Sequence, residues 1–270
     1  DIVIQSDPQR IALNFLEVPN IREGLHVADG LTHSDFQFLS EELGEPYASR
    51  FVSAQQLVAD FRGERVALEL VEFSKVADLT SSYIERALSN EVITPGVTTH
   101  NDVSWWLEEQ RESMGLLRTW YPTVYTHLPD GGEIGGTDRV IQRGDVLQID
   151  WGLERNNFAT DIKRFGYVLR EGEAEVPPGI QNAFEESLRV QRIIRNNVTS
   201  GRTGREQIDA LKQIIRDAGY VYTEEERASD VEGIEVNVGM HAAGNIGHDM
   251  AASLFEIFPF RTEYMVRPNN

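Results

Sequence analysis

Residues 144–168 read GDVLQIDWGLERNNFATDIKRFGYV, and they place two aspartates, Asp150 and Asp161, inside what the sequence otherwise predicts to be two β-strands. Aspartate is a poor strand former, so two of them in neighbouring strands need a reason. A hairpin that turns around residues 154–157 sets Asp150 directly opposite Asp161. Like charges in that arrangement repel each other. The hairpin therefore predicts a cation between the two carboxylates.

Divalent metal ions are one candidate for that cation. The two ions of a hydrolytic site stand about 3.5 to 4 Å apart and take carboxylate oxygens as ligands, which suits an opposed aspartate pair. The alternative is that the end of the hairpin is exposed to solvent and that water solvates both carboxylates. The spacing alone does not decide between the two, so the rest of the sequence must.

Composition excludes several classes of partner. The chain has 270 residues, 40% of them hydrophobic, which is enough for one large domain or for a domain plus a fragment. Its net charge of -19 repels nucleic acid and anionic lipid, so we expect neither as a partner. No apolar run approaches the ~20 residues that cross a bilayer.

Cysteine is absent, which excludes disulfides and thiolate metal sites but leaves the compartment open. The sequence begins without Met, so a signal peptide could precede it. A cytoplasmic location is favoured, and periplasmic or secreted locations stay open.

Hydrophobic periodicity divides the chain near residue 63. Before it, residues 1–4 and 10–15 read as short strands around a turn-rich middle. After it, apolar residues recur at three- and four-residue steps, which predicts helices. Two domains are expected, at residues 1–63 and 64–270. The predicted helices run from residue 65 to before 90, from 101 to 114, from the prolines at 177–178, and from a capping box at 203–206 to Gly219.

Two junctions between helices resemble each other. Residues 93–99 read ITPGVTT and residues 198–204 read VTSGRTG, in register at a separation of 105 residues. The repeat predicts a duplicated α+β half-domain whose two copies pair their sheets. The alternative is that glycine followed by threonine is a common way to end one helix and to cap the next.

Three histidines are candidates for a site. His241 and His248 lie in VGMHAAGNIGHDMA at residues 238–251, where small neighbours leave room for a ligand and neutral imidazole can bind a divalent metal. A glycine-rich turn with two ordinary histidines is the alternative. His127 precedes a long loop, where it could bind substrate or simply be solvated. The other histidines, His26, His33 and His100, are predicted to lie at the surface.

Together these segments resemble the pita-bread metallopeptidases, which include aminopeptidase P, prolidase, methionine aminopeptidase and the metal-free creatinase. The resemblance rests on GDVLQIDWG at residues 144–152, on TD at 160–161 with the following Arg164 and Tyr167, and on GHDM at 247–250. The repeated loops agree with it. ADGLT at residues 28–32 and RFVSA at 50–54 resemble the end of the N-terminal domain of the creatinase and aminopeptidase P branch.

The resemblance implies an α+β pita-bread fold and a site with two divalent ions, which in this family are held by two Asp, one His and two Glu. Asp150, Asp161 and His248 would be ligands, and His241 would contact substrate and help proton transfer. The family's second histidine is replaced by Phe255. Its two glutamates are expected beyond residue 270, so the fold would be truncated at its C-terminus and the 270-residue chain alone would be inactive and bind metal weakly.

The implied activity is metal-dependent hydrolysis of Xaa-Pro bonds at peptide N-termini through a water activated by two metal ions. Manganese is the favoured metal, and cobalt, zinc or iron would accept the same ligands. The expected partners are a small peptide substrate and a second copy of the chain in a homodimer. Two alternatives stay open: a metal-free, creatinase-like hydrolase, and a non-catalytic binding protein with the same fold.

Overall fold

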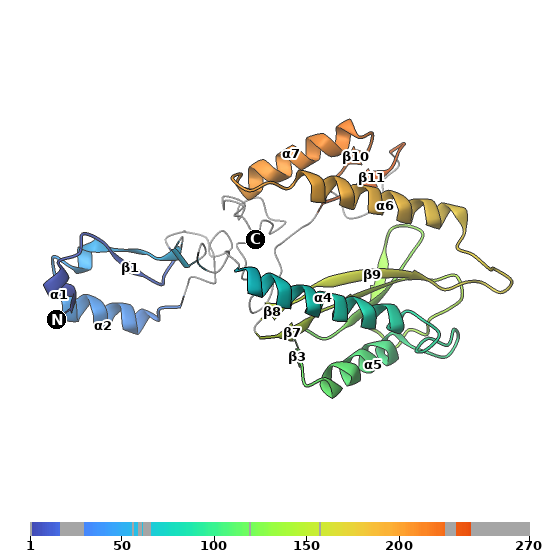
Figure 1. The fold of residues 1–270 in the computed structure, drawn as a ribbon, viewed down its shortest axis with the longest axis horizontal. Coiled ribbons are helices and arrows are strands. Elements are labelled where there is room, and N and C mark those ends of the chain that lie inside the picture. Colours follow the sequence, from blue (N-terminus) through green and yellow to red (C-terminus); the bar gives the residue numbers. More distant parts are fainter. Residues whose placement is uncertain are drawn as a thin grey trace.

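The computed structural model describes residues 2–16, 30–55, 57–58, 61, 66–118, 120–156, 158–224 and 231–238. Figure 1 shows a small group of N-terminal elements at one end of the molecule, followed by a larger body of helices and strands. The predicted hairpin at residues 144–168 lies within that larger body.

The N-terminal elements are α1 (Ile2–Ser6), β1 (Ile11–Leu13), α2 (His33–Leu43), η3 (Ala48–Arg50) and β2 (Phe51–Ser53). β1 and β2 pair in parallel, and Phe36 packs edge-on against Phe15 and Phe51. The strand predicted at residues 10–15 is confirmed. The strand predicted at residues 1–4 is wrong: residues 2–6 form a helix, and among the described strands β1 pairs only with β2. The domain boundary at residue 63 stays a prediction.

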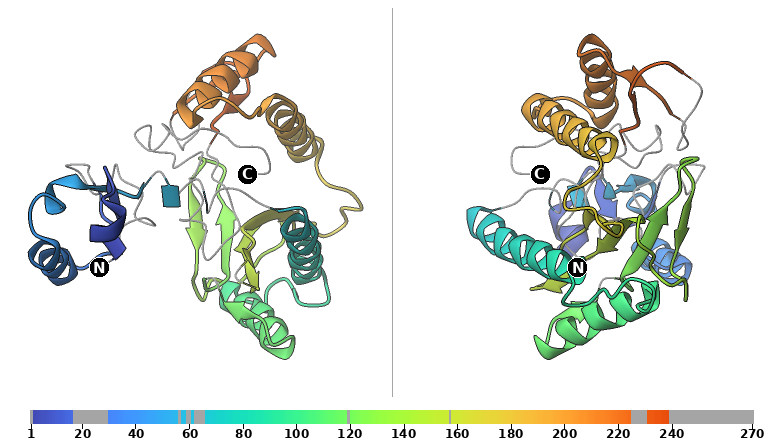
Figure 2. Two further views of the ribbon diagram at one scale, coloured as in Figure 1. Left: turned by 60° about the vertical axis from the view of Figure 1, so that its left-hand side comes forward. Right: turned by 90° about the vertical axis from the view of Figure 1, so that its right-hand side faces the viewer.

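The larger body begins with two helices that cover one face of an antiparallel sheet (Figure 2). α4 packs against β6 and β9, and α5 packs against β4. The strand orders are β5-β4-β6-β9 in the larger sheet and β3-β7-β8 in a smaller one. The elements are α4 (Ala67–Ala87), α5 (His100–Ser113), β3 (Leu117–Arg118), β4 (Thr123–His127), β5 (Glu133–Gly135), β6 (Val146–Trp151), β7 (Leu153–Arg155), β8 (Phe158–Ala159) and β9 (Ile162–Tyr167).

Apolar side chains between these helices and the sheet form the larger of the two hydrophobic clusters described. Its members come from α4, α5, β4, β6 and β7, and they include Ile84, Leu107, Val124, Ile149, Trp151 and Leu153. Ile84, Leu107, Ile149, Trp151 and Leu153 have no solvent exposure. Burial on this scale fixes the sheet against the helices, because each such side chain contributes about 1.5–3 kcal/mol when removed from water.

A second pair of helices follows, on the far side of the strands from α5 in Figure 1. It consists of α6 (Pro178–Asn197) and α7 (Gly204–Asp217), with the short parallel strands β10 (Val221–Tyr222) and β11 (Glu235–Val236) beside them. Val190, Ile215, Tyr220, Val236 and Val238 form the smaller cluster.

All four predicted helices of the larger body are confirmed, and local signals explain where they begin. The Thr99 side chain accepts a hydrogen bond from the Asp102 amide, and the Asp102 carboxylate accepts one from the Thr99 amide. Thr203 and Glu206 make the same reciprocal pair at the start of α7. Such capping boxes satisfy amide groups that the helix itself leaves unpaired.

The internal repeat is present in the backbone as well as in the sequence. α4 and α6 have 21 and 20 residues, and α5 and α7 have 14 each. The glycines of the two loops, Gly96 and Gly201, both have positive φ, at 82° and 88°. The second loop reaches its capping threonine one residue sooner. Among the described strands β10 and β11 pair only with each other, so the pairing of the two half-sheets stays a prediction.

Within the ranges that the structure describes, no helix is both long and apolar enough to span a bilayer.

Candidate active site

The two faces of the four-stranded sheet have opposite characters. In β6, Leu147, Ile149 and Trp151 point into the hydrophobic cluster, so the alternate residues Gln148 and Asp150 point to the other face. His127 of β4 lies on the same face as these two, because the register pairs it with Val146. The face away from α4 and α5 therefore carries the polar side chains of the candidate site.

The predicted register of the hairpin is wrong by two residues. Asp150 lies opposite Lys163 of β9, and the turn lies between Arg155 and Phe158, which pair with each other. Asn156 adopts a φ of 54° at this turn, a conformation that asparagine tolerates better than most residues. A shift of one residue would turn Asp161 to the other face, but a shift of two leaves it on the face of Asp150.

A cation does lie between the two carboxylates, and it is the ammonium group of Lys163. Its Nζ is 3.0 Å from Oδ2 of Asp150 and 3.3 Å from Oδ1 of Asp161. The side chains of Asp150 and Asp161 are only 20% and 9% exposed. The alternative in which both carboxylates are simply solvated is therefore wrong.

Burial governs the electrostatics of this cluster. It raises the pKa of Asp150; the contact with Lys163 opposes that shift, and the charge of Asp161 adds to it. Burial also acts to lower the pKa of Lys163, but the two carboxylates outweigh it and the pKa of Lys163 is raised. One ammonium faces two carboxylates, and Oδ1 of Asp150 is buried and has no hydrogen-bond partner among the residues that the structure describes. Lys163 therefore balances at most one of the two carboxylate charges.

A cavity of about 520 Å³ opens over these residues. Its wall includes Asp150, Lys163, Tyr125, His127 and Gln148. The remaining lining residues are Gly131, Gly132 and Glu133. His127 thus lines the same cavity as Asp150, and its role in binding substrate stays a prediction.

His127 is held in a defined orientation. Its Nε2 is 2.8 Å from Oε1 of Gln148, and its ring lies 5.4 Å from the ring of Phe165. An amide oxygen can only accept, so Nε2 is the donor in this contact. Gln148 and Phe165 therefore fix the orientation of the ring at the cavity.

Carboxylate oxygens are the type of donor that a hard or borderline divalent cation prefers. One of them, Oδ1 of Asp150, is buried and has no hydrogen-bond partner among the described residues. These donors are few in number. No group of three or more potential metal-binding side chains occurs among the described residues. His241 and His248 lie outside the described residues, so their roles as proton-transfer and metal-binding residues stay predictions.

Sequence reasoning missed Lys163 and misplaced His100. Lys163 could have been found from its position two residues after Asp161, which puts both side chains on one face of a strand. His100 is fully buried rather than at the surface, with Nε2 2.8 Å from Oγ1 of Thr126. The first residue of a capped helix is usually exposed, but here β4 covers it.

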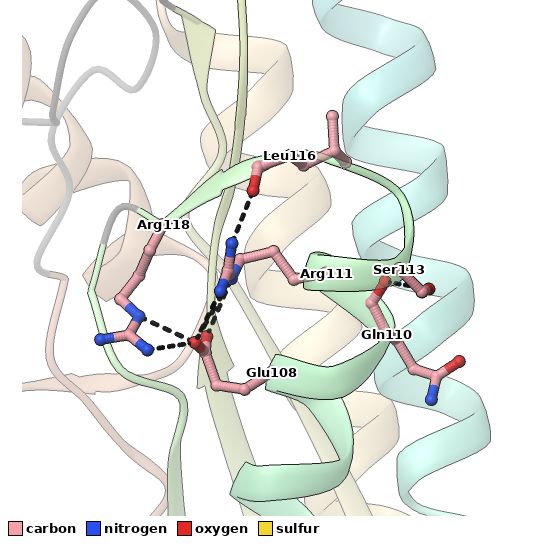
Figure 3. Close-up of polar contacts among 6 residues, drawn as sticks. All are labelled: Glu108, Gln110, Arg111, Ser113, Leu116 and Arg118. Atoms are coloured by element: carbon pink, nitrogen blue, oxygen red, sulfur yellow. Dashed lines mark hydrogen bonds and ion pairs between the residues drawn. The ribbon is translucent and has the colours of Figure 1, made fainter.

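Glu108 is the most buried acid among the described residues outside the cavity, and it serves the fold. Figure 3 shows the side chains of Arg111 and Arg118 converging on its carboxylate. Arg118 Nε donates to Oε2 of Glu108 at 2.8 Å, and Arg111 also donates to the carbonyl of Leu116 at 2.6 Å. A carboxylate already paired with two guanidinium groups has no place for a metal ion.

Residues 72–263 match metallopeptidase family M24. The chain belongs to this family. No curated protein sequence matches this M24 chain. Its structure is similar to the X-Pro aminopeptidase from Thermotoga maritima, with a TM-score of 0.65 and 17% identity, over 99% of this chain and 65% of that one.

Two further M24 comparisons agree on the fold. A prolidase from Pyrococcus furiosus has a TM-score of 0.60 at 18% identity, over 88% of this chain and 63% of that one. A Xaa-Pro dipeptidase from Bacillus anthracis has a TM-score of 0.57 at 19% identity, over 99% and 64%. The M24 chain spans less than two thirds of the length of each. The pita-bread fold predicted from the sequence is confirmed.

Proposed function

We propose that this M24 chain forms part of a metal-dependent peptidase. The enzyme hydrolyses the Xaa-Pro bond at the N-terminus of peptides that have proline in the second position. The observation that carries the proposal is a pair of largely buried carboxylates, Asp150 and Asp161, which share Lys163 as their cation, with Asp150 and Lys163 at the wall of a cavity of about 520 Å³. The proline preference is supported by the names of the similar solved structures, which are an X-Pro aminopeptidase, a prolidase and a Xaa-Pro dipeptidase.

In the proposed site Asp150, Asp161 and His248 hold divalent ions, with manganese favoured over cobalt, zinc or iron. Bound ions would supply Lewis acidity and a water activated for attack on a peptide carbonyl. Two histidines would bind substrate and transfer the proton. His127 would accept a hydrogen bond from the peptide through Nδ1, and His241 would carry a proton to or from the reacting group. A homodimer is part of the proposal, and nucleic acid and membranes are not.

The test uses the natural full-length protein, peptides with proline or alanine in second position, and added manganese. We expect cleavage before proline to be preferred and to stop when the metal is chelated. Asp161→Asn should lower kcat/KM by more than about 100-fold while the protein stays folded. Replacing residues that only contact metal ligands already lowers metal affinity or activity by about 10- to 100-fold, and Asp161 is proposed to be a ligand itself.

Glu154→Gln is the matched control. It neutralises a carboxylate of the same hairpin that does not line the cavity. Full activity of Asp161→Asn, or equal loss in both variants, would contradict the proposed role of Asp161.

A second candidate function is favoured by Lys163. Because an ammonium already neutralises part of the carboxylate pair, the cavity could work as a metal-free hydrolase or as a binding site without catalysis. Hydrolysis that persists in chelator would favour the metal-free enzyme. Peptide binding without hydrolysis, with and without manganese, would favour the binding protein.

A further inference from the structure

We propose that Lys163 is a resident counter-cation that competes with divalent metal ions for the Asp150–Asp161 pair, so that metal must displace its ammonium group to bind. The inference rests on the proposed metal site. It adds a residue that lowers metal affinity while stabilising the metal-free fold.

The first argument is exclusion. Lys163 Nζ contacts one oxygen of each aspartate, at 3.0 and 3.3 Å. An ion held by those same two oxygens would need the space that Nζ fills. The ammonium and such an ion therefore cannot be bound together.

The second argument is charge. The two carboxylates carry two negative charges, and the single charge of Lys163 balances at most one of them. Oδ1 of Asp150 is buried and has no hydrogen-bond partner among the described residues, so it can still accept a cation. A divalent ion carries twice the charge of the ammonium, so the pair still attracts metal while Lys163 is in place.

The third argument is that Lys163 can leave. Its side chain is 47% exposed, and it lies at the wall of the cavity rather than beneath it. A lysine stem is flexible and its ammonium is strongly hydrated, so Nζ can move into the water of the cavity when a stronger cation arrives. The aspartates, held on paired strands and largely buried, stay where they are.

Two effects of opposite sign follow from removing the charge at position 163. Without metal, Lys163→Met removes the ammonium that contacts both of these largely buried carboxylates, so the thermal midpoint should fall. With metal, the competitor is gone and affinity should rise. Partly exposed ion pairs are weak, so losing the competing ammonium should tighten manganese binding by about tenfold, which corresponds to about 1.4 kcal/mol. A merely structural residue would lower stability without raising affinity.

The experiment is isothermal titration of metal-free, full-length protein with MnCl2, paired with thermal melts in chelator and in manganese. Wild type is compared with Lys163→Met and with Lys163→Arg, which keeps the charge and should keep the weaker affinity. Lys75→Met is the matched control, because Lys75 contacts a single carboxylate, Glu72, on the exposed side of α4.

The expected result is tighter manganese binding and a lower metal-free midpoint for Lys163→Met, with Lys163→Arg and Lys75→Met close to wild type in affinity. Equal affinity in wild type and Lys163→Met, where manganese binds both, overturns the competition and leaves the proposed metallopeptidase standing. If manganese binds neither, the metal site and the competition both fall. Should Lys163→Met fold only when manganese is present, Lys163→Gln serves for the titration and the same outcomes apply.

Discussion

His100 shows how a single residue can carry a pH dependence. It is fully buried at the start of α5, and its Nδ1 has no hydrogen-bond partner among the described residues. Burial lowers the pKa of His100, the charge of Arg139 lowers it further, and Asp145 opposes both. The folded protein therefore holds this imidazole neutral at a pH at which the unfolded chain binds a proton.

The sign of the effect follows from that difference. Since the folded pKa of His100 lies below the unfolded value of about 6.5, stability is fully present above pH ~6.5 and falls as the pH drops towards the folded pKa. We expect protonation of His100 to lower the wild-type free energy of unfolding by up to about 1.4 kcal/mol for each unit by which the pH falls. His100→Gln should remove that slope below pH ~6.5 in urea denaturation.

His33→Gln is the control for His100. His33 is exposed at the start of α2, so its replacement should change the free energy of unfolding by less than about 0.5 kcal/mol. Parallel curves for wild type and His100→Gln would show that the imidazole is not held neutral by burial.

At the scale of elements, the end of α5 is joined to β3 by charge. Glu108 of α5 is 4% exposed and pairs with Arg111 of the same helix and with Arg118 of β3. Breaking a buried ion pair costs more than the pair contributes, because the remaining charge loses its partner. The network therefore fixes where the chain turns from the helix into the sheet (Figure 3).

We expect Glu108→Gln to lower the free energy of unfolding by about 3 kcal/mol, the lower end of the usual cost for a broken buried pair, since Arg118 is half exposed. Chemical denaturation measures this. Glu109→Gln changes the neighbouring, exposed acid and should stay within about 0.5 kcal/mol of wild type. A similar small effect at both positions would mean that solvent already screens the Glu108 pairs.

At the scale of the whole molecule, the described parts of the two halves of the repeat differ in how much apolar surface they bury. The larger cluster joins α4, α5 and the four-stranded sheet, and the described part of the smaller one joins α6, α7, β10 and β11. Fewer buried apolar contacts mean a lower cost of local opening. The second half should therefore open more readily than the first.

Hydrogen exchange followed by mass spectrometry tests this order. Amides of β6 and α4 should exchange most slowly, and those of α6 and α7 sooner. Ile215→Ala, in the smaller cluster, should speed exchange in α6 and α7 and leave β6 unchanged. Uniform acceleration across both halves would show instead that the two clusters open as one unit.

Local patterns were enough to predict much of this protein from its sequence. Helix starts at Thr99 and Thr203 could be read from their capping boxes, because the hydrogen bonds that begin a helix join residues three apart. Strand alternation placed Asp150 and Asp161 on one face, and the order of motifs pointed to the family to which the chain belongs.

Tertiary structure alone decided the register, the burial of His100 and the partner of the aspartates. The register depends on how the turn around Asn156 closes, and His100 is buried only because β4 covers it. Lys163 reaches both carboxylates because the register sets it opposite Asp150. Neighbours in sequence fix periodicity and caps, whereas contacts between distant segments fix which charges meet, and the chemistry of this site depends on the latter.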